Sequence, residues 1–255
     1  MAMSTPEQRF SSISFFCPAY NEEKSIPLLI PKVSALLSSL TEAYEIIIIE
    51  NGSRDKTALV ADELAGKYRG VRVLHYEKGL GYGGALVEGF KHSKYDYVCY
   101  TDGDNQYNVD EFRDGFRLMG DADIASGYAR SKAVSTYRKA QSNIFNLLIW
   151  LLFFFRIRDI NCSMKIYKRK VLDTIEIKSL SAFIDAEMLL RAHHAGFTIA
   201  QFPVTHYERI AGTAIGSKPS VIIGTIVDML KFRLRTVVKS PDGRARLRSH
   251  PSGGR

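Results

Sequence analysis

The sequence predicts an α/β protein whose mainly parallel sheet is flanked by helices on both faces. Three observations support this prediction. Short β-rich runs alternate with runs of helical hydrophobic spacing through the first half of the chain. Most predicted strands end at Pro, Asn, Asp or Gly, the residues typical of turns. The 255 residues, 45% hydrophobic and 24% charged, have the size and composition of a folded globular protein.

The elements of the first half follow in order. Residues 13–17 predict a buried strand that ends at Pro18, and apolar residues at helical spacing predict a helix over 26–40. The isoleucine run in 45–49 is typical of a strand covered on both faces. The remaining elements are helices over 57–68, with Asp55 as N-cap, and 83–94, and strands over 71–76, 97–101 and 122–126.

The second half is less regular. We expect helices over 137–155 and 185–195, a strand over 198–202 that ends at Pro203, and an amphipathic, increasingly basic helix over 221–235. The longest apolar run, 147–155, is shorter than the roughly 20 residues that a membrane-spanning helix needs. The chain is therefore expected to form one domain over 1–218, followed by an amphipathic segment and basic tail over 219–255.

Positive charge concentrates at the end of the chain. Of the net charge of +8, residues 231–255 carry +7, from eight Lys and Arg against the single acid Asp242. Such an arm suits an anionic surface, either membrane phospholipid or nucleic acid, although a solvated disordered end has the same composition. The rest of the chain is nearly neutral and has no basic stripe, which disfavours a nucleic-acid-binding protein.

The cysteines indicate the compartment. Cys17, Cys99 and Cys162 lie far apart and form no C-x-x-C pair, so we expect neither a zinc site nor disulfides. The first residues lack the pattern of a secretion signal. A cytoplasmic protein is the simpler interpretation.

Polar residues follow three of the predicted strands. The clusters are residues 18–23, 50–55 and 102–106, and the carboxyl ends of parallel strands meet at one edge of a sheet. In the third cluster, Asp102 and Asp104 flank a glycine and can share one hard divalent cation, Mg²⁺ or Mn²⁺. A solvated acidic turn is the alternative interpretation.

A glycine-rich loop at 78–84 literally matches G-x-G-x-x-G. A dinucleotide-dependent oxidoreductase would need this motif after the first strand, with an acid about 20 residues further on. Here the motif follows the third strand, and the acid at that distance is Asp102. We therefore favour a loop of close backbone approach over a dinucleotide site.

Together these motifs resemble the family 2 glycosyltransferases of GT-A fold, and in particular the polyprenyl-phosphate sugar transferases that include dolichol-phosphate mannose synthase. The resemblance runs from about Ile13 to Gly216. It rests on Pro18-Ala19-Tyr20-Asn21-Glu22, the motif of 45–57, the loop and helix of 79–89, Asp102-Gly103-Asp104-Asn105-Gln106, Ser126-Gly127-Tyr128, Phe183-Ile184-Asp185-Ala186-Glu187 and residues 203–209. One departure is Glu50-Asn51, where the family usually has two aspartates, which leaves a uridine or guanosine donor open.

The resemblance implies roles for individual residues. The residues implied to bind the nucleotide sugar are Pro18, Tyr20, Glu22, Asn51, Lys78, Gly83 and Asp102. Those implied to hold Mg²⁺ or Mn²⁺ are Asp102, Asp104 and Gln106, and the catalytic residues are Asp104, Asp185, Glu187 and Arg209. Arg130, Arg138 and Ser142 are implied to bind the acceptor phosphate, for which the planar fork of arginine is suited.

The nature of the acceptor decides the chemistry. A polyprenyl phosphate is already anionic and needs no strong base, whereas a hydroxyl acceptor of a soluble family 2 transferase would need Asp185 or Glu187 as base. Residues at i and i+2 do not share a helix face, so only one of these acids is expected to reach the site.

The apolar run near Trp150 and Phe153, with residues 221–235, is expected to lie peripherally on the cytosolic face of a membrane, where inverting sugar transfer would occur. A core helix or a homodimer face is the alternative.

Overall fold

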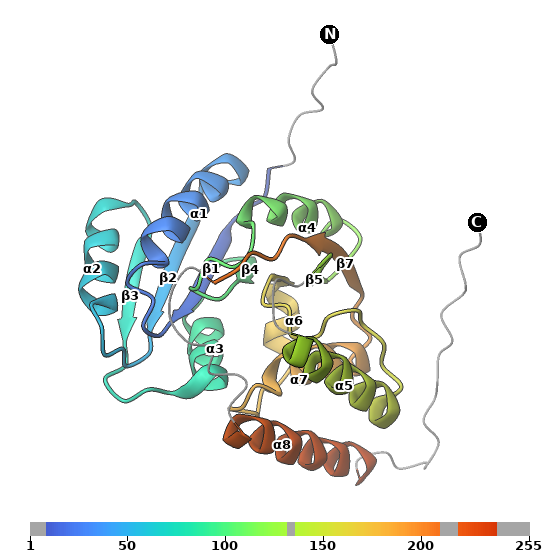
Figure 1. The fold of residues 1–255 in the computed structure, drawn as a ribbon. Helices are drawn as coiled ribbons and strands as arrows, with labels where there is room; N and C mark the ends of the chain where they lie inside the picture. Colours follow the sequence, from blue (N-terminus) through green and yellow to red (C-terminus); the bar gives the residue numbers. More distant parts are fainter. Residues whose placement is uncertain (1–8, 132–135, 210–218, 239–255) are drawn as a thin grey trace.

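The computed structural model describes residues 9–131, 136–209 and 219–238 (Figure 1). The strands are β1 (Ile13–Ala19), β2 (Tyr44–Glu50), β3 (Val71–His75), β4 (Tyr97–Tyr100), β5 (Ile124–Ala129), β6 (Lys165–Lys168) and β7 (Ile199–Val204). The helices are α1 (Ile26–Leu40), α2 (Thr57–Lys67), α3 (Gly81–His92), α4 (Phe112–Leu118), α5 (Thr136–Phe153), α6 (Arg169–Thr174), α7 (Ile184–His194) and α8 (Pro219–Val238). A short 3₁₀ helix, Val109–Glu111, precedes α4.

The strands form one sheet in the order β3-β2-β1-β4-β6-β5-β7. β1 to β4 are parallel and β5 is parallel to β7, but β6 runs antiparallel to both of its neighbours. The prediction of a mainly parallel sheet is confirmed. The four-residue β6, which the sequence did not reveal, joins its two halves.

Two prolines predicted to end strands lie inside them. The carbonyl of Pro18 accepts from the Gly103 amide at 3.0 Å, so the missing N–H of this residue faces the β4 side. The β1–β4 ladder has already ended at Phe16 and Tyr100, and no bond is lost there. Pro203 lies in β7, an edge strand, where a proline is also tolerated.

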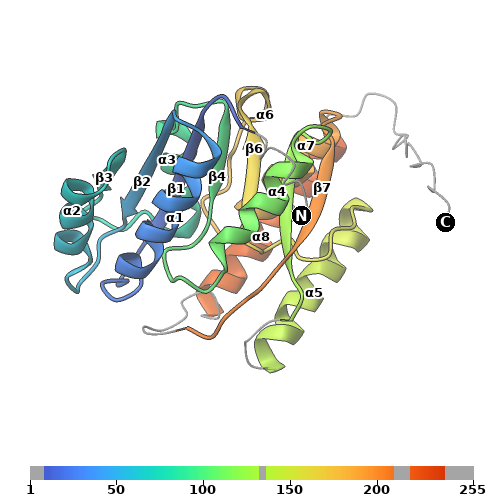
Figure 2. The same ribbon diagram turned by 90° about the horizontal axis from the view of Figure 1, so that it is seen from above.

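Helices cover both faces of the sheet (Figure 2). One face packs against α1, α2 and α4, with Phe15 and Ile46 of the strands facing that layer. The other face packs against α3 and α7, to which α5 and α8 add Ile149, Met229 and Phe232. The β-rich runs predicted these buried strands correctly, because residues that alternate along a strand point to opposite layers.

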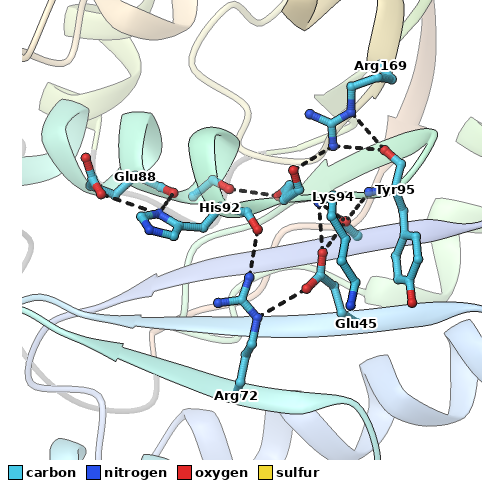
Figure 3. A network of polar contacts seen from close by, with 10 residues as sticks. Glu45, Arg72, Glu88, His92, Lys94, Tyr95 and Arg169 are labelled. Atoms are coloured by element: carbon cyan, nitrogen blue, oxygen red, sulfur yellow. Dashed lines mark hydrogen bonds and ion pairs between the residues drawn. The ribbon is translucent and has the colours of Figure 1, made fainter.

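The amino-terminal edge of the sheet is held by a polar network (Figure 3). The buried carboxylate of Glu45 accepts from the Ser14 hydroxyl at 2.6 Å, the Lys94 amide at 3.0 Å and Arg72 at 3.2 Å. Arg72 also donates to the His92 carbonyl at 2.7 Å. These contacts tie the starts of β1, β2 and β3 to the connection between α3 and β4.

No helix within the described residues is long and apolar enough to cross a membrane. α5 and α8 each leave apolar side chains exposed: Ile144, Leu147, Trp150 and Leu151 on α5, and Ile223, Ile226, Val227, Leu230 and Leu234 on α8. Because α8 also contributes to the core, it packs onto the domain that was predicted to end at residue 218. Most of the basic tail, residues 239–255, lies outside the described residues.

Candidate active site at the carboxyl edge of the sheet

The three predicted polar clusters meet where the strand order changes direction. β1 lies between β2 and β4, and the loops that follow these strands are bonded to one another. The Asn51 amide donates to the Ala19 carbonyl and the Asn21 amide to the Ser53 hydroxyl, at 3.0 and 3.1 Å. Ligands of open α/β sheets bind at such a switch point.

Asp102 follows β4 and has an unusual carboxyl group. Its Oδ1 atom is buried and has no hydrogen-bond partner among the residues that the structure describes. Burial, followed by the nearby charges of Asp104 and Asp185, raises its pKa to about 8. A buried carboxylate oxygen that nothing in the fold donates to is available to a cation or to a ligand donor.

Asp104 lies in a bridge of charges across the site. Arg209, from the segment after β7, donates to the Asp104 carboxylate at 2.6 Å and to the Glu22 carboxylate at 2.8 Å. Burial and the charge of Asp104 raise the pKa of Glu22, and Arg209 partly offsets this effect. The bridge brings together three predicted site residues that are up to 187 residues apart in the chain.

The backbone at the site adopts the left-handed region twice outside glycine. Asn21 has φ of 56° and Asn105 has φ of 55°. Asn105 lies between Asp104 and Gln106, and within the described ranges its buried side-chain oxygen has no hydrogen-bond partner. Such conformations are uncommon in ordinary loops and cluster at functional sites.

Gln106 holds the segment that carries Arg209. Its side-chain amide donates to the Tyr207 carbonyl at 3.0 Å, and its own carbonyl accepts from the Tyr207 amide at 2.7 Å. Its backbone amide donates to Asp104 at 3.2 Å. Gln106 therefore lies beside the predicted metal residues and also fixes the position of the arginine.

The carboxyl groups fit a divalent cation that a ligand helps to hold. Within the described ranges, no three His, Cys, Asp or Glu side chains are grouped to bind a metal by themselves. Asp102 and Asp104 lie together with one buried oxygen unpartnered. Mg²⁺ is commonly bound in this way, by one or two carboxylates plus the phosphate oxygens of a substrate.

Asn51 binds the glycine-rich loop. Its side-chain oxygen accepts from the Leu80 amide at 2.7 Å, and its side-chain nitrogen donates to the Gly81 carbonyl at 3.2 Å. Gly52 has φ of 72°, and a Cβ there would lie 2.9 Å from the Gly79 nitrogen. The expected close backbone approach is confirmed, and its partner is the end of β2.

The other predicted donor residues differ in exposure. Pro18 and Tyr20 are half-buried at the end of β1, whereas Lys78 is exposed at the start of the glycine-rich loop. Gly83 is buried in the first turn of α3, where a Cβ would overlap the backbone of Leu180. Gly83 thus allows residues 180–181 to pack against this helix.

Asp185 lies in a fully occupied buried network. Its Oδ1 accepts from the Lys165 ammonium at 2.6 Å and from the Tyr100 hydroxyl, and its Oδ2 accepts from the Tyr82 hydroxyl at 3.0 Å. Asp185 is 2% exposed and Lys165 is 0% exposed. Lys165 was not predicted as a site residue, because a lysine in a short strand carries no signal for a buried ion pair.

The carboxylate of Glu187 binds residues that lie close to it in the sequence. Its carboxylate accepts from the Ser179 amide at 2.7 Å, from the Lys178 amide at 3.2 Å and from the Arg191 side chain at 2.7 Å. It is 1% exposed. Glu187 therefore fixes the segment before α7 to the helix.

A cavity of about 480 Å³ lies between β5 and α5. Arg130 and Ser142, both predicted to bind an acceptor phosphate, line it together with Tyr128, Ala129, Ser131, Lys139, Asn143, Asn146, Arg158 and Asp159. The side chain of Arg138 lies outside the described part of the structure. Lys139 and Arg158 were not predicted from the sequence. The Arg158 guanidinium lies 4.6 Å from the centre of the Tyr128 ring.

The fold and the site define an α/β protein with acidic residues at the switch point of its sheet, and Arg130, Lys139 and Arg158 line the cavity between β5 and α5. The chain belongs to glycosyl transferase family 2, because the model of that family matches residues 14–176. The prediction of this family and of a glycosyltransferase is thus confirmed.

Two curated relatives are similar over most of this chain. The glycosyltransferase AglD of Haloferax volcanii is 32% identical over 203 residues, which cover 75% of this chain and 32% of AglD. An undecaprenyl-phosphate 4-deoxy-4-formamido-L-arabinose transferase of Salmonella enteritidis PT4 is 30% identical over 208 residues, which cover 78% of this chain and 61% of that protein. The chain thus spans less than two thirds of either relative.

The fold has solved counterparts. Glucosyl-3-phosphoglycerate synthase from Mycobacterium tuberculosis, in complex with phosphoglyceric acid, superposes with a TM-score of 0.69 at 19% identity, over 87% of this chain and 79% of that chain. The same enzyme in complex with Mn²⁺, uridine diphosphate and phosphoglyceric acid gives a TM-score of 0.66 at 19% identity, over 91% and 80% of the two chains. The predicted GT-A fold is confirmed.

Proposed function

We propose that this protein transfers a sugar from a nucleotide sugar to a polyprenyl phosphate, with inversion at the sugar carbon. The Salmonella relative is named for such an acceptor, and its similarity to this chain supports the proposal. The donor is UDP- or GDP-linked. Asn51 does not discriminate between the two bases, because its side-chain oxygen and nitrogen already bind the glycine-rich loop.

The observation that carries the proposal is that the carboxylates of Asp185 and Glu187 are already bound by neighbouring side chains and backbone amides. A hydroxyl acceptor needs a base that takes up its proton as the bond forms. Asp185 is held by a lysine and two tyrosines, and Glu187 by two backbone amides and Arg191. Both side chains are almost fully buried. The geometry therefore suits an acceptor that is already ionised, as a phosphate is.

The reaction is then a single displacement. A phosphate oxygen of the acceptor attacks the anomeric carbon, and a new carbon–oxygen bond forms. The bond between that carbon and the diphosphate breaks on the opposite side, and its electron pair leaves with the nucleoside diphosphate. No proton transfer is required, and the configuration inverts.

The donor side must stabilise the charge that develops on the diphosphate. Asp102 and Asp104 would hold Mg²⁺ or Mn²⁺, with Gln106 beside them, and the cation supplies charge neutralisation for the leaving group. Arg209 brings a second positive charge to the same place, where it is bound to Asp104 and Glu22. Its fork can bind phosphate oxygens in two-point fashion.

The acceptor side is the cavity between β5 and α5. Arg130, Lys139 and Arg158 supply positive charge, and Ser142 supplies a hydroxyl. Arg138 precedes Lys139 on α5 and belongs to this proposal as well. The cavity opens beside the helix whose exposed apolar residues include Ile144 and Leu147, which suits a lipid chain attached to a bound phosphate.

The exposed apolar residues of α5 and α8 would lie in the interface of a membrane. Ring contacts between Phe153 of α5 and Phe232 of α8 join the two helices at 5.6 Å. Amphipathic helices that expose such residues bind at the boundary of headgroups and acyl chains. We place the protein peripherally on the cytosolic face, where nucleotide sugars are available, with the tail on anionic lipid.

The test is a transfer assay with the full chain. UDP- and GDP-sugars are each incubated with Mn²⁺ and undecaprenyl phosphate in detergent, and nucleoside diphosphate release is measured. We expect one nucleotide to support release that depends on the lipid phosphate. Transfer to undecaprenol, which lacks the phosphate, would refute the proposal, as would transfer to 3-phosphoglycerate without any lipid.

A further inference from the structure

We propose that Glu187, Arg191 and Phe232 form a relay that lets helix α8 set the position of residues 178–181 on the donor side of the site. We call residues 178–181 the strap. This inference rests on the proposed function, because it assigns the strap to the binding of the nucleotide sugar.

The first link joins the strap to Glu187. The backbone amides of Lys178 and Ser179 donate to its carboxylate, and the shortest of these bonds is 2.7 Å. No regular secondary structure holds the strap, which lies between α6 and α7. A nearly fully buried charge needs such donors, so the carboxylate and the strap fix each other.

The second link joins the strap to the donor site. Residues 180–181 lie so close to Gly83 that a Cβ at this position would overlap the backbone of Leu180. Gly83 follows Tyr82, whose hydroxyl binds Asp185, and the glycine-rich loop that Asn51 holds. A displaced strap would therefore move the first turn of α3 and the loop beside the nucleotide.

The third link joins Glu187 to α8. Arg191 donates to the Glu187 carboxylate through Nε and Nη2, each at 2.7 Å. The guanidinium lies 5.1 Å from the centre of the Phe232 ring, where a cation is attracted to the π face. Phe232 also contacts Phe183, which immediately precedes α7, with ring centres 5.6 Å apart.

Phe232 faces inward from a helix whose other face is apolar and exposed. It is 4% exposed, whereas Leu230 and Leu234 of the same helix are 48% and 67% exposed. α8 therefore has an exposed apolar face on one side, and on the other side Phe232 contacts Arg191, Phe183 and Phe153. A ligand that shifts α8 relative to the domain, such as a lipid surface, would also displace the strap. The displacement would pass through Phe232, Arg191 and Glu187.

The experiment uses the full chain in detergent, with undecaprenyl phosphate as the acceptor and without lipid vesicles. Phe232→Ala and Arg191→Met each break one link, Arg191→Lys keeps the charge but loses the planar guanidinium, and Lys231→Met on the exposed face of α8 is the matched control. Three quantities are measured: the rate of amide hydrogen exchange at Lys178 and Ser179, and the KM and the kcat for the nucleotide sugar. Cooperative thermal unfolding confirms that each variant is folded.

The relay predicts faster exchange at both amides and a KM raised at least about fivefold in Phe232→Ala and Arg191→Met, the lower range of coupling between sites. The kcat should change less, Arg191→Lys should be intermediate, and Lys231→Met should match the wild type. Unchanged exchange in both variants overturns the relay. Faster exchange with unchanged KM overturns it too, because the strap would then be structural only.

Failure of the proposed function gives a different result. A wild-type protein that turns over no nucleotide sugar refutes the proposed function, but the exchange rates still decide whether Phe232 and Arg191 hold the strap. If Phe232→Ala does not fold, Arg191→Met decides the outcome, since Arg191 is partly exposed.

Discussion

The buried carboxylates at the two edges of the sheet differ in their hydrogen bonding. At the amino-terminal edge, Glu45 is 3% exposed and is bound by a hydroxyl, a backbone amide and a guanidinium (Figure 3). At the carboxyl edge, Asp102 has a buried oxygen to which none of the described residues donates, and its pKa is raised. Both acids lie within one residue or two of a strand end, so local structure does not explain the difference.

The buried carboxylate at the amino-terminal edge stabilises the fold, whereas the one at the carboxyl edge is available to bind a ligand. A fully bonded carboxylate strengthens the fold, whereas an unpartnered one destabilises it until something binds. Strained backbone at Asn21 and Asn105 accompanies only the second edge among the non-glycine residues of these loops.

The largest effect is expected at the carboxyl edge. Asp104→Asn removes a charge that would hold the metal and should lower the rate of nucleoside diphosphate release about 100- to 1,000-fold, comparable to the loss of one transition-state contact. The measurement is the steady-state rate with Mn²⁺ and lipid phosphate. Because this change also weakens the ion pair with Arg209, cooperative thermal unfolding is checked first, and an active Asp104→Asn would remove this residue from the mechanism.

The matching change at the amino-terminal edge should affect stability instead. Glu45→Gln weakens the network with Arg72 and should lower the free energy of unfolding by about 1–3 kcal/mol. Urea denaturation measures this loss. The kcat of the folded fraction should equal that of the wild type, and a reduced kcat would show that this edge is not purely structural.

The pH dependence of stability should separate Asp102 from ordinary acids. Its folded pKa of about 8 lies above its unfolded value, so its protonation stabilises the metal-free protein below about pH 4. This stabilisation is lost as the pH rises towards 8. Asp102→Asn should therefore raise the unfolding free energy by about 1–2 kcal/mol at pH 8.5 and leave it unchanged at pH 4. A thermal unfolding series with a chelator present checks the prediction.

The smallest effect is expected at Asp96, where substitution should lower stability, whereas Asp102→Asn should raise it. Hydrogen bonds from Ser11 and Ser12 lower the pKa of Asp96, an exposed residue at the amino-terminal edge. Its contribution is present above its unfolded pKa, near 4, and is lost as the pH falls through the lowered folded value. Asp96→Asn should lower stability at pH 7 by less than about 1 kcal/mol. Equal stability of the variant and the wild type at pH 2 completes the test by thermal unfolding.

The sequence predicted the elements with strong periodicity, and it predicted where polar residues would gather. α1 matches the expected helix over 26–40, and the clusters after β1, β2 and β4 meet as the parallel topology requires. β6 was missed, because its four residues, Lys-Ile-Tyr-Lys, have no distinctive pattern. The proline boundaries were wrong because tolerance of proline depends on which side of a strand has a partner.

The sequence by itself determined the family, the sheet and the set of acidic residues at its carboxyl edge, since these follow from short-range patterns and motifs. Only the tertiary structure decided which of these acids has a carboxylate oxygen that no described residue binds. Lys165 and Tyr100 reach Asp185 across 20 and 85 residues, and Arg209 reaches Glu22 across 187. Such pairings depend on strand order and packing, because a carboxylate's partners are those that the folded chain brings within hydrogen-bond distance.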